Sequence, residues 1–449
     1  MKAAKDSKSF YKLVFSLVVP MALQNLINVA VTSADVVMLG RVGETVLSGS
    51  SLAGQVQFIL TLIFFGLTSG AAVLTAQYWG KGDTRTIEKV MGIAMRFSLI
   101  AGGLFTLAVL LFPHQAMRIF TPDEAVIDQG VKYLRIVALS YLPISISIVY
   151  LNIMRSVERV VISTIVYLTS LLVNIGINAV LIFGLLGFPA MGIEGAAVGT
   201  LIARLVELAI VVVYAKCNKV IHFKPRDILV RDPALFHDFL RYSIPVTLNE
   251  LMWGAGSSMN AVVIGHLGSS AVAANSVAQV MRQLATVIAF GIANAAAILI
   301  GKAIGEERYD TAKEYSKRLV KVTLLAGLGG AAVIMIARPI VMAVMNLTPI
   351  AEGYLSVMMF VMSYFVVCQA YNTTMVVGVF RAGGDTKFGL ALDVSTMWGG
   401  SILLGAIAAF VFHWSVPAVY VILMCDEIIK IPFTTWRYKS MKWMRNVTR

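Results

Sequence analysis

The sequence contains few charged residues and few cysteines. Asp, Glu, Lys and Arg make up 14% of the 449 residues, whereas roughly a quarter of a soluble globular protein is charged. Cys217, Cys368 and Cys425 are odd in number and form no C-x-x-C pair, so no disulfide framework is predicted. The sequence also has no H-E-x-x-H, G-x-S-x-G or P-loop motif, which argues against a membrane enzyme and against ATP as an energy source.

Long apolar runs are abundant instead. Hydrophobic residues make up 58% of the chain and the mean hydropathy is +0.81. The runs are continuous and about 20 residues long, as helices that cross a bilayer require, and they lack the alternation of β-barrel strands. The sequence therefore predicts an all-α integral membrane protein with twelve transmembrane helices, at 14–39, 51–78, 91–112, 133–153, 160–184, 192–215, 241–264, 276–301, 319–344, 353–379, 388–411 and 416–436.

The basic residues predict the orientation of these spans. The formal net charge is +13, but most of the 37 Lys and Arg residues fall in alternate loops and in the two terminal segments. Because positive loops stay on the cytoplasmic side, both termini are expected in the cytoplasm of a multi-pass protein of the cell membrane. Membrane lipid then accounts for the charge, and a nucleic-acid partner is not expected.

The two halves of the sequence resemble each other. With a shift of 225 residues, Pro20 falls on Pro245, Gly40 on Gly265 and Gly80 on Gly305. Six spans per half predict two parallel six-helix repeats, an architecture typical of carriers. The expected parts are an N-lobe at 1–215, a basic linker at 216–240, a C-lobe at 241–436 and a basic tail at 437–449.

The first predicted span carries a polar stripe. A carboxylate such as Asp35 costs about 2.5–3.5 kcal/mol at a bilayer centre, so it must contact protein or water. Pro20, in the same span, lacks an N–H and is a candidate hinge. The side chains that share the arc of about 80° on this helix are Asn25, Asn28, Thr32 and Asp35.

Other polar residues are expected to line the interior. In the second half, the same stripe contains Glu250, Ser257 and Asn260. Amides and hydroxyls beside a carboxylate suit a hard cation or a stored proton, and those expected near Asp35 are Asn152, Asn174, Asn178 and Thr200. Residues expected in the second lobe's cavity are Tyr364, Gln369 and Asn372. Arg204 and Glu207 are expected to pair with each other, while Asp426 and Glu427 are expected to reach the headgroups.

Together these features resemble the multidrug and toxic compound extrusion (MATE) transporters. The first span has the form P-x14-D-x-V-x-x-G, "NIGINAVLIFG" precedes "GIEGAAVGTLIAR", and "FRAGGDTKF" at 380–388 is close to the family's R-G-x-G-D-T pattern. The resemblance implies a V-shaped carrier that exports organic, often cationic, compounds in exchange for protons or sodium. A single chain is sufficient for this mechanism, no cofactor is implied beyond the coupling ion, and the oligomeric state is left open.

The resemblance also implies which residues bind the ion. The N-lobe cation site of the family corresponds to Asp35 with Asn152, Asn174, Asn178 and Thr200. NorM-type members carry two further acids where this chain has Trp253 and Ala370, and this difference favours the DinF-like branch. A lipid-linked oligosaccharide flippase is the alternative, although it would need several basic residues in the cavity. A channel is the other alternative.

Overall fold

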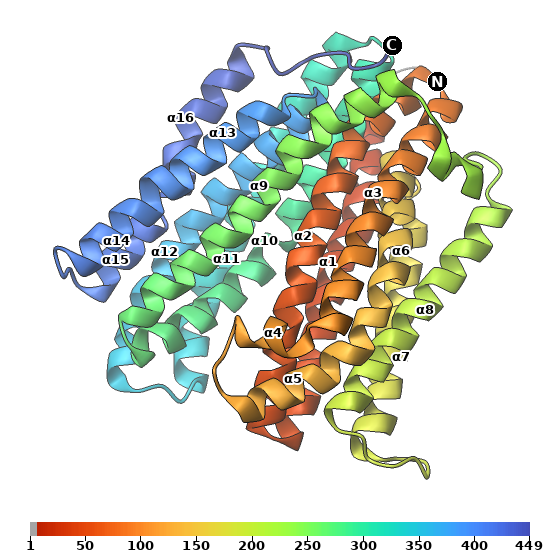
Figure 1. The fold of residues 1–449 in the computed structure, drawn as a ribbon. Helices are drawn as coiled ribbons and strands as arrows, with labels where there is room; N and C mark the ends of the chain where they lie inside the picture. The colour runs from red at the N-terminus through yellow and green to blue at the C-terminus, as the bar shows by residue number, and fades with distance from the viewer. Residues whose placement is uncertain (1–6) are drawn as a thin grey trace. The chain divides into compact units, whose positions relative to one another are not determined.

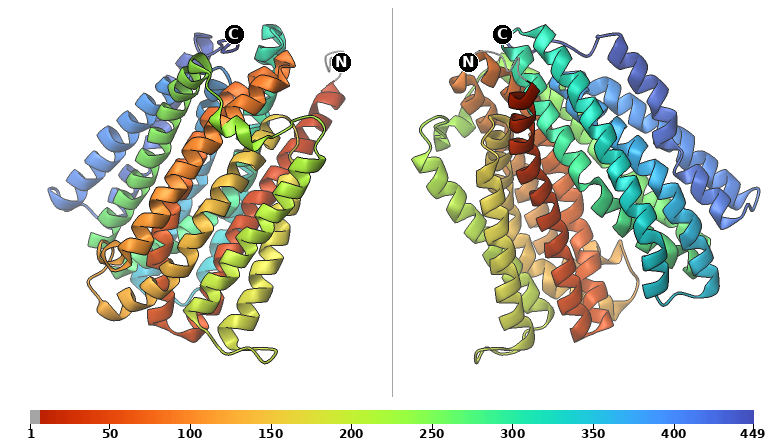
Figure 2. Two further views of the ribbon diagram at one scale, coloured as in Figure 1. Left: turned by 45° about the vertical axis from the view of Figure 1, so that its right-hand side comes forward. Right: turned by 180° about the vertical axis from the view of Figure 1, so that it is seen from behind.

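The computed structural model describes residues 7–449, and these residues form helices and loops without any β-strand. Figures 1 and 2 show long helices joined by short connections. The helices of the first half are α1 (Ser7–Val42), α2 (Glu44–Lys81), α3 (Thr84–Leu111), α4 (Pro113–Arg118), α5 (Glu124–Val137), η1 (Ala138–Ser140), α6 (Tyr141–Ser156), α7 (Val161–Phe183), α8 (Ile193–Cys217) and η2 (Pro225–Leu229).

The second half begins with the long helix α9 (Pro233–His266). The helices that follow are α10 (Ser269–Gly305), α11 (Tyr309–Val344), α12 (Pro349–Thr373), α13 (Thr386–Thr396), α14 (Leu403–Phe410), α15 (Val416–Leu423) and α16 (Asp426–Lys439). Two segments are wound as π-helix, namely η3 (Thr374–Phe380), which continues α12, and η4 (Met397–Ile402), which joins α13 to α14.

The expected all-helical membrane fold is confirmed. Within the described residues, ten helices are long and apolar enough to cross a bilayer. The seventh predicted span lies in α9, which is 34 residues long but carries a polar stripe that lowers its hydropathy. The twelfth predicted span is divided into α15 and α16 by a break at Met424 and Cys425.

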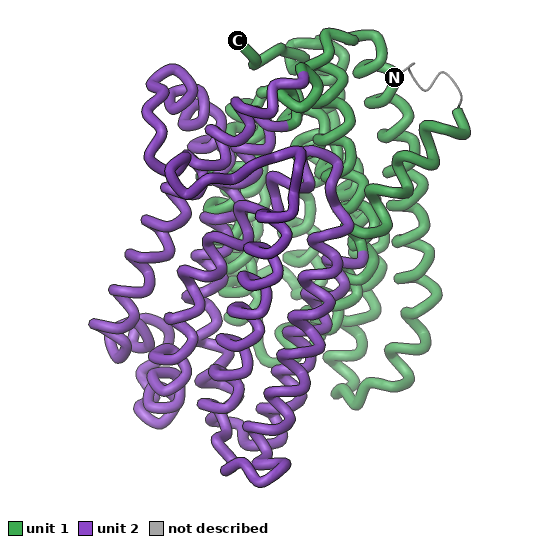
Figure 3. Tube along the Cα trace, turned by 90° about the vertical axis from the view of Figure 1, so that its right-hand side faces the viewer, with its two compact units in different colours: residues 1–22, 76–81, 248–449 green, residues 23–75, 82–247 purple. Residues whose placement is uncertain are grey.

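The chain forms two compact units, drawn in different colours in Figure 3. Unit 1 contains residues 1–22, 76–81 and 248–449, and unit 2 contains residues 23–75 and 82–247. Compared with the lobes expected from sequence, the first part of α1 belongs with the C-terminal half, and the segment 216–247 belongs with the N-terminal half. Helix α1 passes from unit 1 to unit 2 at a point two residues after Pro20. Helix α9 passes from unit 2 to unit 1 at a point two residues after Pro245.

In unit 2, small residues allow α2 to approach α9 closely. A Cβ atom at Gly66 would lie 2.4 Å from Thr247 Cα, and one at Gly70 would lie 2.4 Å from Ser243 Cα. This G-x-x-x-G spacing places both glycines on one face of α2. Toward the N-terminal end of α2, its apolar side chains join the unit 2 core with α5 and α8, around Phe64, Leu134 and Ala197.

In unit 1, α2 and α10 approach each other through equivalent glycines. A Cβ atom at Gly80 would lie 2.1 Å from the Lys302 carbonyl oxygen, and one at Gly305 would lie 1.8 Å from the Gln77 carbonyl oxygen. The shift of 225 that relates Gly80 to Gly305 also relates Gln77 to Lys302. The two close contacts are therefore symmetric, as expected of a duplicated structure.

Candidate functional site

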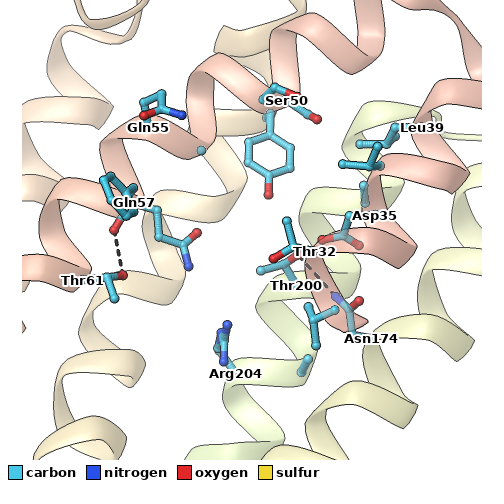
Figure 4. Close-up of a pocket in the computed structure, with 18 of the residues that line it drawn as sticks. Thr32, Asp35, Leu39, Ser50, Gln55, Gln57, Thr61, Asn174, Thr200 and Arg204 are labelled. Atoms are coloured by element: carbon cyan, nitrogen blue, oxygen red, sulfur yellow. Dashed lines mark hydrogen bonds between the residues drawn. The ribbon is translucent and has the colours of Figure 1, made fainter. Parts of the chain in front are cut away.

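A pocket of about 470 Å³ lies within unit 2. Ligand-binding pockets typically measure about 300–1,000 Å³. Figure 4 shows Thr32, Asp35, Asn174 and Thr200 gathered on one side of the pocket, with Gln55, Gln57 and Thr61 of α2 on another. The lining residues that carry polar groups are Thr32, Asp35, Ser50, Ser51, Gln55, Gln57, Thr61, Tyr133, Ser170, Asn174, Thr200 and Arg204.

Asp35 is the acidic residue of this lining, and it is held by amides from α7. Asn178 Nδ2 donates a hydrogen bond to Asp35 Oδ1 at 2.6 Å, and it also lies 3.3 Å from Asn174 Oδ1. Asn174 Nδ2 in turn lies 3.5 Å from Thr200 Oγ1 on α8. The structure thus brings together four residues of the predicted ion site, from three helices. Asn174 and Asn178 share a face of α7 because they are four residues apart.

The Asn178 amide is buried and only partly satisfied. Its side chain is fully buried, and its Oδ1 atom has no hydrogen-bond partner in the structure. Gly199 on α8 leaves room for the Asn178 amide, since a Cβ atom on residue 199 would lie 1.9 Å from Asn178 Oδ1. A buried acceptor without a donor costs about 1–3 kcal/mol. An acceptor oxygen with unused hydrogen-bonding capacity therefore lies on the amide that binds the Asp35 carboxylate.

Arg204 is a basic residue of the pocket, and its role in the lining was missed by sequence analysis. The predicted ion pair with Glu207 is confirmed, with Arg204 Nη1 2.6 Å from Glu207 Oε1. Arg204 nevertheless also lines the pocket, one turn along α8 from Thr200 (Figure 4). The spacing of four residues between Thr200 and Arg204 could have predicted this position, because residues four apart lie on the same face of a helix. Asp35, Arg204 and Glu207 together carry one net negative charge.

Other residues predicted for the N-lobe lie outside the pocket lining. Asn152 belongs to a separate cluster, where its Nδ2 donates to the Ile148 carbonyl at 2.8 Å and its Oδ1 accepts from Arg155. Asn28 is exposed and Asn25 is half-buried on α1. Pro20 lies within a continuous α1, so the hinge stays a prediction.

The residues predicted for the second cavity belong to unit 1 but form several separate contacts. Glu250 pairs with Arg381 at 2.8 Å, and Gln369 Oε1 lies 3.4 Å from Arg282 Nη1. The remaining positions are Asn372, buried and bonded to Glu427 and Thr434, half-buried Tyr364 and Asn260, and exposed Ser257.

The expectation that Asp426 and Glu427 reach the headgroups is wrong. Both are only 7% exposed, and Lys430 lies between them and Asp393. The helix break at Met424 and Cys425 places these acids at the start of α16, where one helical turn brings Asp426, Glu427 and Lys430 to the same face. Sequence analysis did not single out Lys430.

Comparison with known proteins agrees with the internal repeat. The sequence model of the MatE family matches residues 20–180 and again 245–407. The two matches begin at Pro20 and Pro245, the same positions that the shift of 225 residues relates. Together they cover more than half of the chain.

Two of the curated relatives are named as probable multidrug resistance proteins. "Probable multidrug resistance protein NorM" of Rhizobium meliloti is 28% identical over 291 residues, which is 64% of this chain and 62% of the relative. "Probable multidrug resistance protein YoeA" of Bacillus subtilis is 22% identical over 404 residues, which is 88% of this chain and 86% of the relative. The match to the first of these thus spans less than two thirds of its length.

Solved structures share the fold. A crystal structure of MATE in the bent conformation is 20% identical and has a TM-score of 0.86, with 96% of each chain covered. A MOP superfamily transporter from Pyrococcus furiosus is also 20% identical, with a TM-score of 0.85 and the same coverage. The twice-matched family model and this shared fold show that the chain is a multi-pass membrane protein and belongs to the MatE family, whose members are transporters.

Proposed function

We propose that this protein is an antiporter that exports small organic cations across the cell membrane in exchange for protons or sodium ions. The observation that carries the proposal is Asp35, a carboxylate in a membrane helix that faces the pocket and accepts a hydrogen bond from Asn178. Membrane-embedded acids of this kind mark ion and substrate pathways. The named relatives support export of drugs as the direction and the purpose of transport.

The charge of the pocket supports the binding of one monovalent cation. Arg204 is paired with Glu207, which leaves the Asp35 carboxylate as the unbalanced charge among these three groups. A proton on Asp35, or a sodium ion held by Asp35 and the oxygens of Asn174, Asn178 and Thr200, would neutralise it. A bound organic cation would do the same, so ion and substrate would compete.

The same charge balance disfavours the flippase alternative. A pyrophosphate group would need several basic residues in the cavity. The pocket lining contains Arg204 as its basic residue, and Glu207 already neutralises that guanidinium. Polar but uncharged side chains such as Gln55 and Tyr133 line the rest of the pocket together with apolar groups, as is common in pockets for small organic molecules.

Coupling requires that the ion bind one conformation more tightly than the other. We place this conformational change at Pro20, close to the point where α1 passes from unit 1 to unit 2. Exchange of one coupling ion for one monovalent organic cation moves no net charge, so the concentration gradient of the coupling ion supplies the free energy. A tenfold ion gradient, equivalent to about 1.4 kcal/mol, then sustains at most about a tenfold gradient of the substrate at one ion per cycle.

The proposal is tested with purified protein in liposomes, with ethidium as the transported cation. Uptake is measured under an imposed proton gradient and, separately, under an imposed sodium gradient, for the parent, for Asp35→Asn and for Asp128→Asn. Asp128 is an exposed acid of α5 in the same unit, so it controls for the loss of a carboxylate. The parent and Asp128→Asn should transport under one of the two gradients, and Asp35→Asn should lose at least about tenfold in rate. Equal transport by Asp35→Asn would contradict the proposal.

A further inference from the structure

Unit 1 contains a cluster of three carboxylates, two buried and one half-buried, around a single buried ammonium group. Lys430 Nζ on α16 lies 3.0 Å from Asp393 Oδ1, 3.1 Å from Glu427 Oε1 and 3.4 Å from Asp426 Oδ2. The Lys430 residue is 4% exposed. Lys430 Nζ donates a hydrogen bond to Glu427 Oε1 and forms ion pairs with all three carboxylates. We call these four residues the Lys430 cluster.

The cluster carries an excess of negative charge. With every group ionised, its three carboxylates and one ammonium sum to two negative charges. Arg282 on α10, whose guanidinium interacts with Asp426 and Glu427, reduces the sum to one. The Glu250–Arg381 pair is neutral as a whole. The other titratable groups that face the cluster carry no charge in their ordinary protonated forms, and they are Tyr364, Cys368, Tyr420 and Cys425.

A buried amide beside the cluster is incompletely satisfied. Asn249 is 5% exposed, and its Nδ2 donates to Asp393 Oδ2 at 2.9 Å. Its Oδ1 atom has no hydrogen-bond partner. The same arrangement occurs at the ion site of unit 2, where Asn178 donates to Asp35 and also keeps an unpartnered Oδ1 atom. In each unit, one amide thus donates to one membrane carboxylate while its own oxygen has no hydrogen-bond partner.

The two amide–carboxylate pairs join equivalent helices. In unit 2, the acid is on α1 and the amide is on α7, which are the first and fifth spans. In unit 1, the amide is on α9 and the acid is on α13, which are the seventh and eleventh spans and so correspond to the first and fifth. The acid is thus on the first helix of the pair in unit 2 and on the second helix of the pair in unit 1. Asp35 lies near the C-terminal end of the first predicted span, 14–39, whereas Asp393 lies near the N-terminal end of the eleventh, 388–411.

Helix irregularities lie next to the cluster. Asn372, which donates to Glu427 Oε2 at 2.8 Å, is followed after one residue by the π-helix η3. Asp393 precedes the π-helix η4 by four residues. Such segments occur often at functional sites, and here both adjoin residues that bind the buried carboxylates.

We propose that the Lys430 cluster is a second proton-exchange site of this chain. A hydronium ion gives its proton to a carboxylate oxygen of the cluster and leaves as water, and the reverse step releases the proton. The proton belongs to the cluster as a whole, because strongly interacting groups titrate together. Coupling of this proton to transport rests on the function proposed above, whereas its presence in the cluster does not.

The net charge of the Lys430 cluster predicts whether each variant should contain more or fewer protonated carboxyl groups than the parent. Infrared difference spectroscopy of the purified protein measures the carboxylic-acid C=O band at neutral pH, in an Asp35→Asn background that removes the contribution of the Asp35 carboxyl group. Asp426→Asn should lower this band because no excess charge then remains, and Lys430→Met should raise it. The double variant Asp426→Asn with Lys430→Met should return to the level of the background protein. Glu352→Gln, which removes an exposed acid of the same unit, should leave the band unchanged.

A purely structural cluster would behave differently. All its carboxylates would stay ionised, the C=O band would be absent from the Asp35→Asn background, and the order of the variants would be lost. Either result would overturn the proposal. Circular dichroism checks that each variant is folded, and the Asp35→Asn background alone still tests for the band should a cluster variant fail to fold.

A second measurement separates this proposal from the proposed function. The number of protons exchanged per ethidium in liposomes should fall by one in Asp426→Asn if the second site is coupled. A parent protein that does not transport ethidium at all would contradict the proposed function, while the infrared result would still decide whether the cluster holds a proton.

Discussion

A Cβ atom on residue 199 would lie 1.9 Å from Asn178 Oδ1, so the glycine of α8 is what allows the Asn178 amide to occupy its position beside Asp35. The contact is between two helices that pack along their length in unit 2, α7 and α8 (Figures 1 and 2). The proposed ion site therefore depends on a residue that has no side chain.

Gly199→Ala should displace the Asn178 amide and weaken transport. The added methyl group cannot be accommodated without movement of Asn178, and a small misplacement can reduce the rate by about a hundredfold. The control is Gly176→Ala on α7, where a Cβ atom would have no neighbour within 4 Å. Ethidium transport in liposomes measures both. Comparable rates in the two variants would show that Asn178 does not position Asp35.

Asn178→Ala and Asn28→Ala should differ, although both asparagines were predicted from sequence to serve the transport pathway. Asn178 is fully buried and donates to Asp35, so its removal should shift the ion concentration that half-saturates transport by about tenfold, as loss of a hydrogen bond to a charged group implies. Asn28 is exposed on α1, and its replacement should have little effect. Transport at varied ion concentration measures the shift. A large effect at Asn28 alone would place the pathway elsewhere on α1.

Gly70→Ala should destabilise the protein through the contact between α2 and α9. The new methyl group would lie 2.4 Å from Ser243 Cα, and overpacking of this kind costs about 1–3 kcal/mol. Gly329→Ala on α11 is the matched control, because Gly329 is exposed and has no neighbour within 4 Å of its Cβ position. Thermal unfolding in detergent should show a lower midpoint for Gly70→Ala only. Equal midpoints would mean that the two helices can separate without cost.

Arg381→Met should destabilise unit 1 more than the double variant Arg381→Met with Glu250→Gln. Arg381 and Glu250 have side chains that are 5% and 15% exposed. Removal of one partner of a buried ion pair costs about 3–5 kcal/mol because it leaves an uncompensated charge. Denaturant unfolding of the parent, both single variants and the double variant measures the coupling energy. If the double variant is no more stable than Arg381→Met, the pair does not compensate charge.

Much of the fold follows from sequence because the bilayer allows few alternatives. Apolar runs of about 20 residues must be helical there, so ten predicted spans correspond to long apolar helices in the structure. The duplication was also predictable, since Pro20 and Pro245 mark the start of both repeats. Asp35, Asn174, Asn178 and Thr200 lie together in the structure, as the resemblance to the MATE transporters implied, whereas helical periodicity alone predicted only that Asn174 and Asn178 share a face.

Contacts that depend on the packing of particular side chains were not predictable. Asn152 shares the polar character of the ion site, but Arg155 binds its Oδ1 atom in another cluster. Arg204 forms the predicted ion pair with Glu207 and also lines the pocket, which was not predicted. Lys430 could not be recognised as the centre of a cluster, because the break before α16 and the position of Asp393 depend on tertiary structure.

The passage of α9 from unit 2 to unit 1 has a consequence for the order in which the chain is made. Unit 2 includes residues up to Thr247, and Gly66 and Gly70 pack against the segment that contains Ser243 and Thr247. This unit therefore cannot complete its packing when the sixth span leaves the ribosome. Its packing becomes complete only after the first part of the seventh span has been synthesised. While the basic segment 216–240 is being synthesised, the surface of α2 that later contacts α9 is therefore still uncovered.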